Sequence, residues 1–287
     1  MSVASAQRPE GSAARSASAP GAPGAATAVR AVVRRGLRDS RSAPLTWGGS
    51  LGVISGLIAA LYPSIARGLS DAVRSYPSGL KEAFGIGQLD TLAAYLHAEL
   101  FSIIVPVAVA VFAIRCASTP IAAAEERGYL ATVLGAPLSR RALTAGTFVT
   151  AALAAPAVLV VSGALTLAGV VISGQDLSVA RLAEALVGVW ALALFFAGVA
   201  ILAAGCSHRA APVTAVSVGV LVVMYLLDVV GKLAGSLGWL RSLSAFRHYG
   251  EPLLNGLSPG RTAGLVLAGA LLAALGALQF ERRDVFG

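Results

Sequence analysis

The sequence is poor in charge. Only 13% of its 287 residues are Asp, Glu, Lys or Arg, about half the share that is typical of soluble globular domains. Hydrophobic residues make up 56%, and the mean hydropathy is +0.78. This scarcity of charge excludes a soluble domain and predicts an integral membrane protein. The net charge of +8 does not require a nucleic acid partner, because Arg and Lys collect in the cytoplasmic loops of membrane proteins.

Residues with catalytic or metal-binding chemistry are also scarce. The two cysteines, Cys116 and Cys206, give no disulfide framework, and the three histidines lie far apart, without the spacing of a metal site. There is no Gly-x-x-x-x-Gly-Lys-Ser/Thr phosphate loop, so the chain cannot be its own P-loop ATPase. His-Glu-x-x-His and Gly-x-Ser-x-Gly are absent as well. We therefore expect no catalytic residue, no metal and no cofactor on this chain.

Long apolar stretches dominate instead. A transmembrane helix needs about 20 mostly apolar residues to cross about 30 Å of hydrocarbon. Six stretches qualify, at residues 45–65, 101–117, 144–172, 185–206, 211–230 and 262–280. The third is long enough to tilt, or to bend at Pro156. The sequence thus predicts an all-α integral membrane protein with six transmembrane helices.

The N-terminal part differs from the rest of the chain. Residues 1–28 are mainly Ala, Ser, Pro and Gly with scattered Arg, and they have too little bulky apolar surface to fold, which predicts a disordered tail. An organellar transit peptide has a similar composition. In residues 29–44, valines and a leucine recur at helical spacing between arginines, which indicates an amphipathic helix in the membrane interface or a charged flank that orients the first span. Residues 45–287 then form the six-helix membrane domain.

An even number of spans places both termini on one side, and the distribution of Arg and Lys decides which. With cytoplasmic termini, the inside segments hold 14 Arg and Lys residues and the outside segments hold 8. Because excess positive charge stays inside, we predict cytoplasmic N- and C-termini and a cytoplasmic loop at residues 121–141. The opposite side carries the loop before the sixth span, where Trp239, Phe246 and Tyr249 among basic residues predict anchoring in the outer interface.

The cytoplasmic loop contains a short predicted helix at residues 122–134. Glu125 and Glu126 fall in its first turn, where the helix dipole favours anions. An apolar stripe at helical spacing follows, made of Tyr129, Leu130, Val133 and Leu134. Such a helix lies along a membrane surface with its charges in water. The alternative is a solvated loop whose charges only prevent insertion.

The end of this helix is marked by two residues that disfavour a helix interior, Gly135 and Pro137. Ser139 follows them and is placed to cap the third transmembrane helix. Arg140 and Arg141 come next. The pattern therefore predicts one helix, a stop and a capped restart between the second and third spans.

The run Glu-Glu-Arg-Gly-Tyr-Leu-Ala-Thr-Val-Leu-Gly-Ala-Pro-Leu-Ser-Arg at residues 125–140 resembles the signature of ABC-2 type transporter permeases. In that signature a Glu-Glu-x-x-Gly-Thr-Leu-like run leads to a Pro-Val-Ser-Arg-like stop. Shorter similarities fit the bacterial six-span branch of the family over residues 30–287. They are Leu37–Arg41, Leu61–Pro63, Lys81–Gly85, Glu99–Ser102, Phe112–Ile114, Phe246–Tyr249 and Phe280–Asp284. Tyr129 departs from the pattern, since the family usually has Thr there.

The resemblance implies the permease subunit of an ATP-driven exporter in a bacterial plasma membrane. In this family the helix between spans two and three is the coupling helix, which rests in a groove of a separate cytoplasmic P-loop ATPase that binds the ATP. Two permeases and two ATPases form the working unit, so a second permease copy is implied, in a homodimer or in a heterodimer with a related permease. The implied ATPase-coupling residues are Glu125, Glu126, Arg127, Gly128, Tyr129, Leu130 and Val133.

Two other functions stay open on the residues alone. A secondary, ion-coupled transporter needs ionisable groups at membrane depth. Asp228 near the end of the fifth span is such a group, although a boundary position or a partner in Lys232 at i+4 also explains it. An intramembrane enzyme needs a nucleophile–base pair or metal ligands in the membrane. No substrate-binding residue is assigned, because the apolar spans suit a lipid-like cargo and helix packing equally well.

Overall fold

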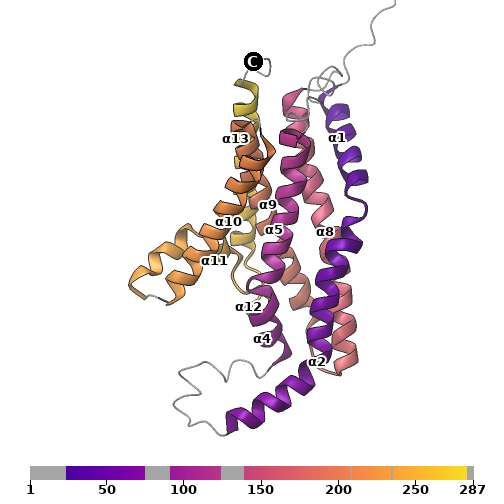
Figure 1. Ribbon diagram of the computed structural model, residues 1–287, viewed down its shortest axis with the longest axis vertical. Helices are drawn as coiled ribbons and strands as arrows, with labels where there is room; N and C mark the ends of the chain where they lie inside the picture. The colour runs from indigo at the N-terminus through magenta and orange to yellow at the C-terminus, as the bar shows by residue number, and fades with distance from the viewer. Residues whose placement is uncertain (1–23, 75–90, 124–138, 208, 234, 283–287) are drawn as a thin grey trace, which may run out of the picture.

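The computed structural model describes residues 24–74, 91–123, 139–207, 209–233 and 235–282. Within these ranges every regular element is a helix (Figure 1). The elements are α1 (Ala25–Asp39), η1 (Pro44–Gly48), α2 (Gly49–Arg74), α4 (Leu92–Leu96), η3 (His97–Phe101), α5 (Ile104–Ser118), η4 (Thr119–Ala123), α8 (Arg140–Ser173), α9 (Val179–Cys206), α10 (Ala210–Leu233), η5 (Gly235–Leu243), α11 (Ala245–Tyr249), α12 (Pro252–Asn255) and α13 (Pro259–Arg282). Residues 1–23 of the predicted disordered tail lie outside the described residues, and its last four residues, 25–28, instead form the start of α1.

In the described part of the chain, six helical segments are long and apolar enough to cross a membrane, which confirms the predicted all-α, six-span fold. They are Pro44–Arg67, Ile104–Ile121, Arg140–Ser173, Val179–Cys206, Ala210–Leu233 and Pro259–Arg282. The start of α1 and the end of α13 lie at the same end of the bundle (Figure 1), as an even number of crossings requires. We call this the terminal end and the opposite one the distal end.

The core of the bundle forms around α9, which packs against α13, α5 and α8. Glycines let α9 and α13 approach until their backbones touch. A Cβ on Gly276 would lie 2.7 Å from the carbonyl oxygen of Ile201, and one on Gly205 would lie 2.5 Å from that of Gly276. Lipid tails are as apolar as the side chains, so helices in a membrane gain little by burying apolar side chains. Small residues help them associate because they let the backbones pack closely.

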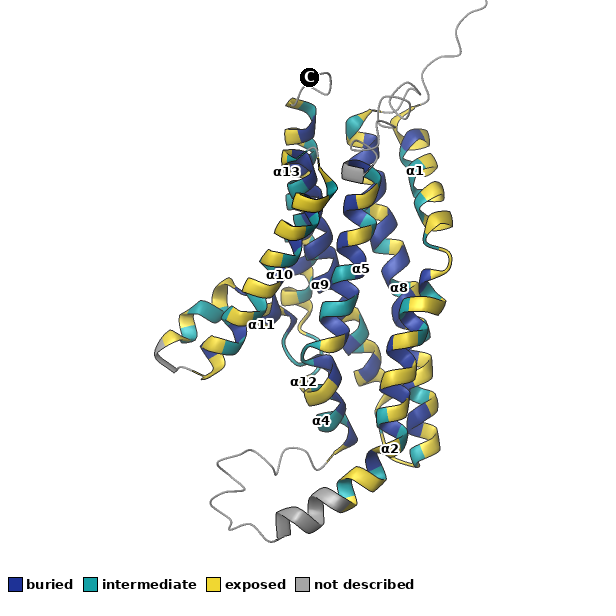
Figure 2. Ribbon diagram, in the orientation of Figure 1, coloured by how far each residue is buried: buried dark blue, intermediate teal, exposed yellow. Residues whose placement is uncertain are grey.

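Helices α1 and α2, joined through η1, follow one side of α8 (Figure 1). The segment from α1 to α2 runs parallel to α8. Gly36 contacts Thr150, and the later residue Gly48 contacts the later residue Val158. Helix α1 therefore stands upright against the first turns of α8. It overlaps the amphipathic helix predicted at residues 29–44, and its four arginines are exposed while its three valines are half-buried. Figure 2 shows the exposed residues on the side of α1 away from α8. Its position in a membrane interface stays a prediction.

The third span continues as one helix through Pro156. Proline has no N–H to donate, so the carbonyl of Ala152, four residues earlier, loses its helical partner. The indole N–H of Trp190 on α9 donates to that carbonyl at 3.0 Å instead. Because an unsatisfied backbone carbonyl is costly in lipid, this bond accommodates a proline within a span and ties α8 to α9.

Short helices fill the distal end of the bundle, where α12 contacts α4 and η3 (Figure 1). Tyr249 of α11 is buried, and its hydroxyl donates to the backbone carbonyl of Phe101 at 3.1 Å. Phe246 is also buried, with its ring against two other aromatic rings. The predicted interfacial anchoring is therefore wrong for these two residues, which pack in the core. Trp239 alone of the three is exposed, at 63%.

Candidate functional site

The residues predicted to contact an ATPase all lie in the loop between the second and third spans. Residues 124–138 are outside the described part of the chain, so the helix at 122–134 and its stop at Gly135 and Pro137 stay predictions. The same holds for the coupling roles of Glu125, Glu126, Arg127, Gly128, Tyr129, Leu130 and Val133. The structure does describe how the two ends of this loop are attached to the bundle.

The end of the loop is fixed where α8 begins. Ser139 caps α8 as predicted, since its hydroxyl accepts a hydrogen bond from the backbone N–H of Ala142 at 3.1 Å. The guanidinium of Arg140 donates to the carbonyl oxygens of Phe280 and Glu281, at 2.7 and 3.2 Å. Its central carbon lies 5.4 Å from the ring centroid of Phe280, within range of a cation–π contact. A cation is favourable here because the last carbonyls of a helix carry partial negative charge.

Arg141 makes a second connection to α13. Its guanidinium donates to both carboxylate oxygens of Glu281, at 2.5 and 2.8 Å, in the two-point geometry that fixes direction as well as distance. The Arg141 side chain is 69% exposed, so water screens the pair and its role is alignment more than stability. We call Ser139, Arg140, Arg141, Phe280 and Glu281 the terminal-end joint. It holds the start of the third span against the end of the sixth.

The start of the loop is fixed by the last turns of the second span. Ile114, Ala117 and Ile121 are fully buried in the core, and η4 contacts α8, α9 and α10. The Sγ atom of Cys116 lies 3.8 Å from the hydroxyl oxygen of Ser40, just beyond α1. The described residues on both sides of the loop are therefore attached to the bundle, at the second span and at the junction of the third and sixth spans.

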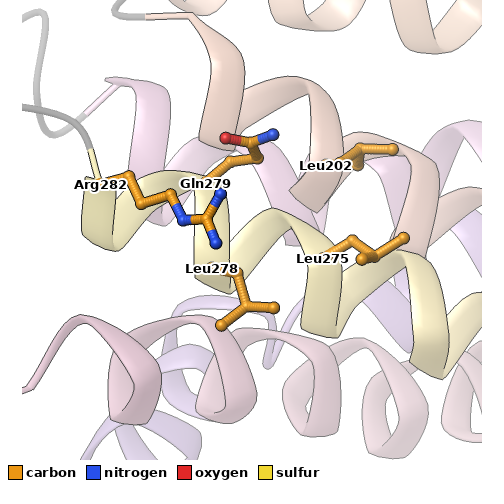
Figure 3. A pocket seen from close by; sticks show the side chains of 5 residues that line it. All are labelled: Leu202, Leu275, Leu278, Gln279 and Arg282. Atoms are coloured by element: carbon orange, nitrogen blue, oxygen red, sulfur yellow. The ribbon is translucent and has the colours of Figure 1, made fainter.

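A shallow hollow lies between α9 and α13 near the joint (Figure 3). Its volume is about 230 Å³, and its lining consists of Leu202, Leu275, Leu278, Gln279 and Arg282. Three leucines supply an apolar wall, while an amide and a guanidinium supply polar groups (Figure 3). Drug-sized sites are larger, roughly 300–1,000 Å³. The hollow is therefore too small to enclose a whole drug-sized molecule.

One buried carboxylate near the end of the fifth span has two cationic partners. The carboxylate oxygens of Asp228, a residue 4% exposed, lie 2.7 Å from the Lys232 ammonium nitrogen and 3.2 Å from the Arg241 Nε atom. The partner predicted at i+4 is confirmed. Arg241 was missed, because it lies on η5, which folds back on α10 in a hairpin that projects from the bundle (Figure 1). Two cations hold this carboxylate in place, which argues against a free proton acceptor.

Two titratable groups at the distal end, His97 and Tyr249, are held uncharged. Burial lowers the pKa of the His97 imidazole, although the nearby Glu251 acts in the opposite direction. Burial raises the pKa of the Tyr249 hydroxyl. Both groups are therefore neutral at pH 7. Among the described residues, no three His, Cys, Asp or Glu side chains gather where they could hold a metal ion.

Comparison with known proteins identifies a family for most of the chain. Residues 36–281 match the family model described as "Multidrug efflux system permease Rv1217c, C-terminal domain". The match begins within α1 and ends one residue before the end of α13, so it includes all six spans and the whole terminal-end joint. A search of curated proteins finds no match.

Proposed function

The chain belongs to this family of multidrug efflux permeases, and we propose that it is the membrane subunit of an ATP-driven ABC-2 type exporter. It is a multi-pass membrane transporter subunit rather than an enzyme. ATP is then bound and hydrolysed by a separate P-loop ATPase, because this sequence has no phosphate loop.

We assign the ATPase contact to the loop between the second and third spans. Glu125 and Glu126 face the ATPase, and Leu130 and Val133 fill an apolar notch on its surface. The observation that carries this proposal is the terminal-end joint. Arg140 and Arg141 tie the end of the loop to α13, so force applied to the loop by a closing ATPase reaches two spans at once. A merely solvated loop has no need of this double attachment.

The working unit contains a second permease copy, in a bacterial plasma membrane with the terminal end in the cytoplasm. The excess of Arg and Lys in the segments at that end supports this orientation. A six-span subunit needs a second half to enclose a path. We favour a homodimer over a pair with a related permease, and chemical crosslinking in native membranes that yields monomers alone would contradict this.

The cargo is an apolar or amphipathic compound that enters from the membrane or the cytoplasm. The family description supports a broad range of drug-like compounds. Energised cells that express the complex should accumulate less of an amphipathic fluorescent dye than cells without it. Equal accumulation of every dye tested would reject this class of cargo.

Charge reversal in the loop tests the coupling role. Charge-assisted contacts at a partly desolvated interface contribute roughly 1.5–3 kcal/mol each, and the double variant Glu125→Lys/Glu126→Lys replaces attraction with repulsion. We expect this variant to reach the membrane in normal amount, to lose the ATPase in a pull-down and to stop exporting. The control Asp39→Lys/Asp176→Lys makes the same change in net charge at two exposed sites. It should still retain the ATPase in a pull-down and still export. Normal ATPase retention by the loop variant would show that the loop is only solvated.

An ion-coupled transporter is the alternative function. The two cationic partners of Asp228 remove its main support. Export that continues without the ATPase gene, and that stops when the proton gradient collapses, would replace the ATP-driven proposal.

A further inference from the structure

The exposed face of α1 carries a row of arginines that the proposed function does not use. Arg30, Arg34 and Arg38 recur every four residues and, at 100° per residue, fall within an arc of about 80° on one face of the helix. Arg35 borders this row, and Arg41 follows just after the helix. All five are exposed. We call Arg30, Arg34 and Arg38 the arginine row.

The opposite face of α1 is fixed against the bundle. A Cβ on Gly36 would lie 2.5 Å from the Cγ2 atom of Thr150, and one on Gly146 would lie 2.7 Å from side-chain atoms of Val32. Helix α1 therefore cannot rotate about its axis without clashing with α8. Its contact side faces α8, so the exposed arginine row lies on the side away from the bundle, and Figure 2 shows exposed residues on that side of α1.

The arginine row is continuous with a surface that faces lipid. The first span begins at Pro44, five residues after α1 ends. Its exposed side carries Val53, Leu57 and Leu61, which are 60%, 57% and 48% exposed. Both α1 and α2 pack on the same helix, α8, so their exposed sides face away from it together. Basic residues thus stand directly next to the polar edge of a lipid-exposed span.

We propose that the arginine row of α1 binds the headgroups of anionic phospholipids. Five arginines and one aspartate give residues 25–41 a net charge of +4. The aspartate, Asp39, lies 4.0 Å from Arg35, and among the described residues no carboxylate forms an ion pair with Arg30, Arg34 or Arg38. Guanidinium groups bind phosphate oxygens in a two-point geometry. Clusters of basic residues next to a transmembrane helix attract anionic lipid by the same electrostatics.

The position of the row favours lipid over a protein partner. It extends along the perimeter of the bundle down to the first residues of a span, where lipid is the neighbour. The predicted ATPase contact lies in the loop between η4 and α8, and α1 turns its Val32 and Gly36 side, opposite the arginine row, toward the start of α8. The inference is independent of the proposed ATPase, since it depends only on the charge, exposure and placement of α1.

Lipid binding to the purified full-length chain tests the proposal. Native mass spectrometry counts the phosphatidylglycerol or phosphatidylcholine molecules retained by the chain in detergent. Each arginine near an anionic surface strengthens attraction about fivefold. We expect Arg30→Gln/Arg34→Gln/Arg38→Gln to weaken phosphatidylglycerol binding at least tenfold and to leave phosphatidylcholine binding unchanged. The Lys triple variant at these positions, which keeps the charge, should retain most of the affinity.

A matched control separates this site from net charge. Arg67→Gln/Arg247→Gln/Arg261→Gln removes the same charge from exposed positions elsewhere and should bind phosphatidylglycerol normally. Equal losses in both triple variants would overturn the proposal. Unchanged phosphatidylglycerol binding by the α1 triple variant would overturn it as well. If that variant lost only its retention of the ATPase, the arginine row would be assigned to the ATPase and the lipid proposal would be wrong. Wild-type phosphatidylglycerol binding that does not weaken between about 0.05 and about 0.5 M salt would also overturn it, without depending on any variant.

Discussion

A single indole N–H makes Pro156 compatible with the third span. Trp190 supplies to the Ala152 carbonyl the hydrogen bond that proline cannot. Trp190→Phe keeps an aromatic ring but leaves that carbonyl unsatisfied, so we expect the free energy of unfolding in detergent to fall by about 1–3 kcal/mol. In a Pro156→Ala background the backbone provides its own bond, and Trp190→Phe should cost clearly less. Equal costs in the two backgrounds would contradict this assignment.

The His97 imidazole makes stability depend on pH. Burial lowers its pKa below the ordinary value of 6.5, so the unfolded chain takes up a proton at a higher pH than the folded chain does. Protonation therefore favours unfolding. The contribution of neutral His97 to stability is complete above about pH 6.5, and it is lost as the pH falls from there through the folded pKa. The thermal midpoint of the wild type should drop between about pH 7.5 and pH 5, and His97→Gln should flatten that drop. An unchanged slope in the variant would assign the pH dependence to other groups.

Two glycines on α13 differ in what surrounds them, and this decides the effect of adding a methyl group. On Gly276 a Cβ would lie 2.7 Å from the backbone carbonyl of Ile201, while on Gly264 nothing lies within 4 Å. We expect Gly276→Ala to separate α9 from α13 and to lower the free energy of unfolding by about 1–3 kcal/mol. Gly264→Ala should be neutral, or stabilising by up to about 1 kcal/mol. Similar unfolding free energies for the two variants would show that the backbones are not in contact.

The helices could be predicted where one local property decides them. Apolar length alone fixes a span, because a helix of about 20 apolar residues has no other stable environment. The cap at Ser139 follows from a similarly local rule. Contacts between distant segments have no such signal. Phe246 and Tyr249 have the composition of interfacial anchors, and their burial depends on partners such as Phe101, which lies 148 residues from Tyr249.

The candidate site was predictable in the same partial way. Adjacent carboxylates, a helix stop and a serine identified the loop after the second span as a functional segment. The joint that fixes this loop joins Arg140 to Phe280 across 140 residues, and nothing in the sequence links the two. The ion pair between Arg241 and Asp228 could not be predicted for the same reason. Arg241 lies on a separate 3-10 helix, so the regular spacing within one helix does not bring the two residues together.

The orientation of the whole molecule can be tested with two accessible positions. Three crossings separate α1 from the loop before α9, so the two lie on opposite sides of the membrane. With Cys116 and Cys206 replaced by Ala, Asp176→Cys should react with an impermeant thiol reagent in intact cells. Ala26→Cys should react only after lysis, because the Arg and Lys distribution places α1 inside. Labelling of Ala26→Cys in intact cells would reverse the orientation.

Helix α8 extends without interruption from the terminal end of the molecule to the distal end. Its 34 residues give a length of about 51 Å, more than the roughly 40–45 Å of a bilayer with its headgroups. Pro156 lies near its midpoint, and close to it the hydrogen bond from Trp190 attaches α8 to α9. If α8 tilted by about 10° around its midpoint, each end, about 25 Å away, would move by about 4 Å, and the two ends would move in opposite directions. Under the proposed coupling, a sideways displacement of the end of α8 at the terminal-end joint would move its distal end in the opposite direction without any change of fold.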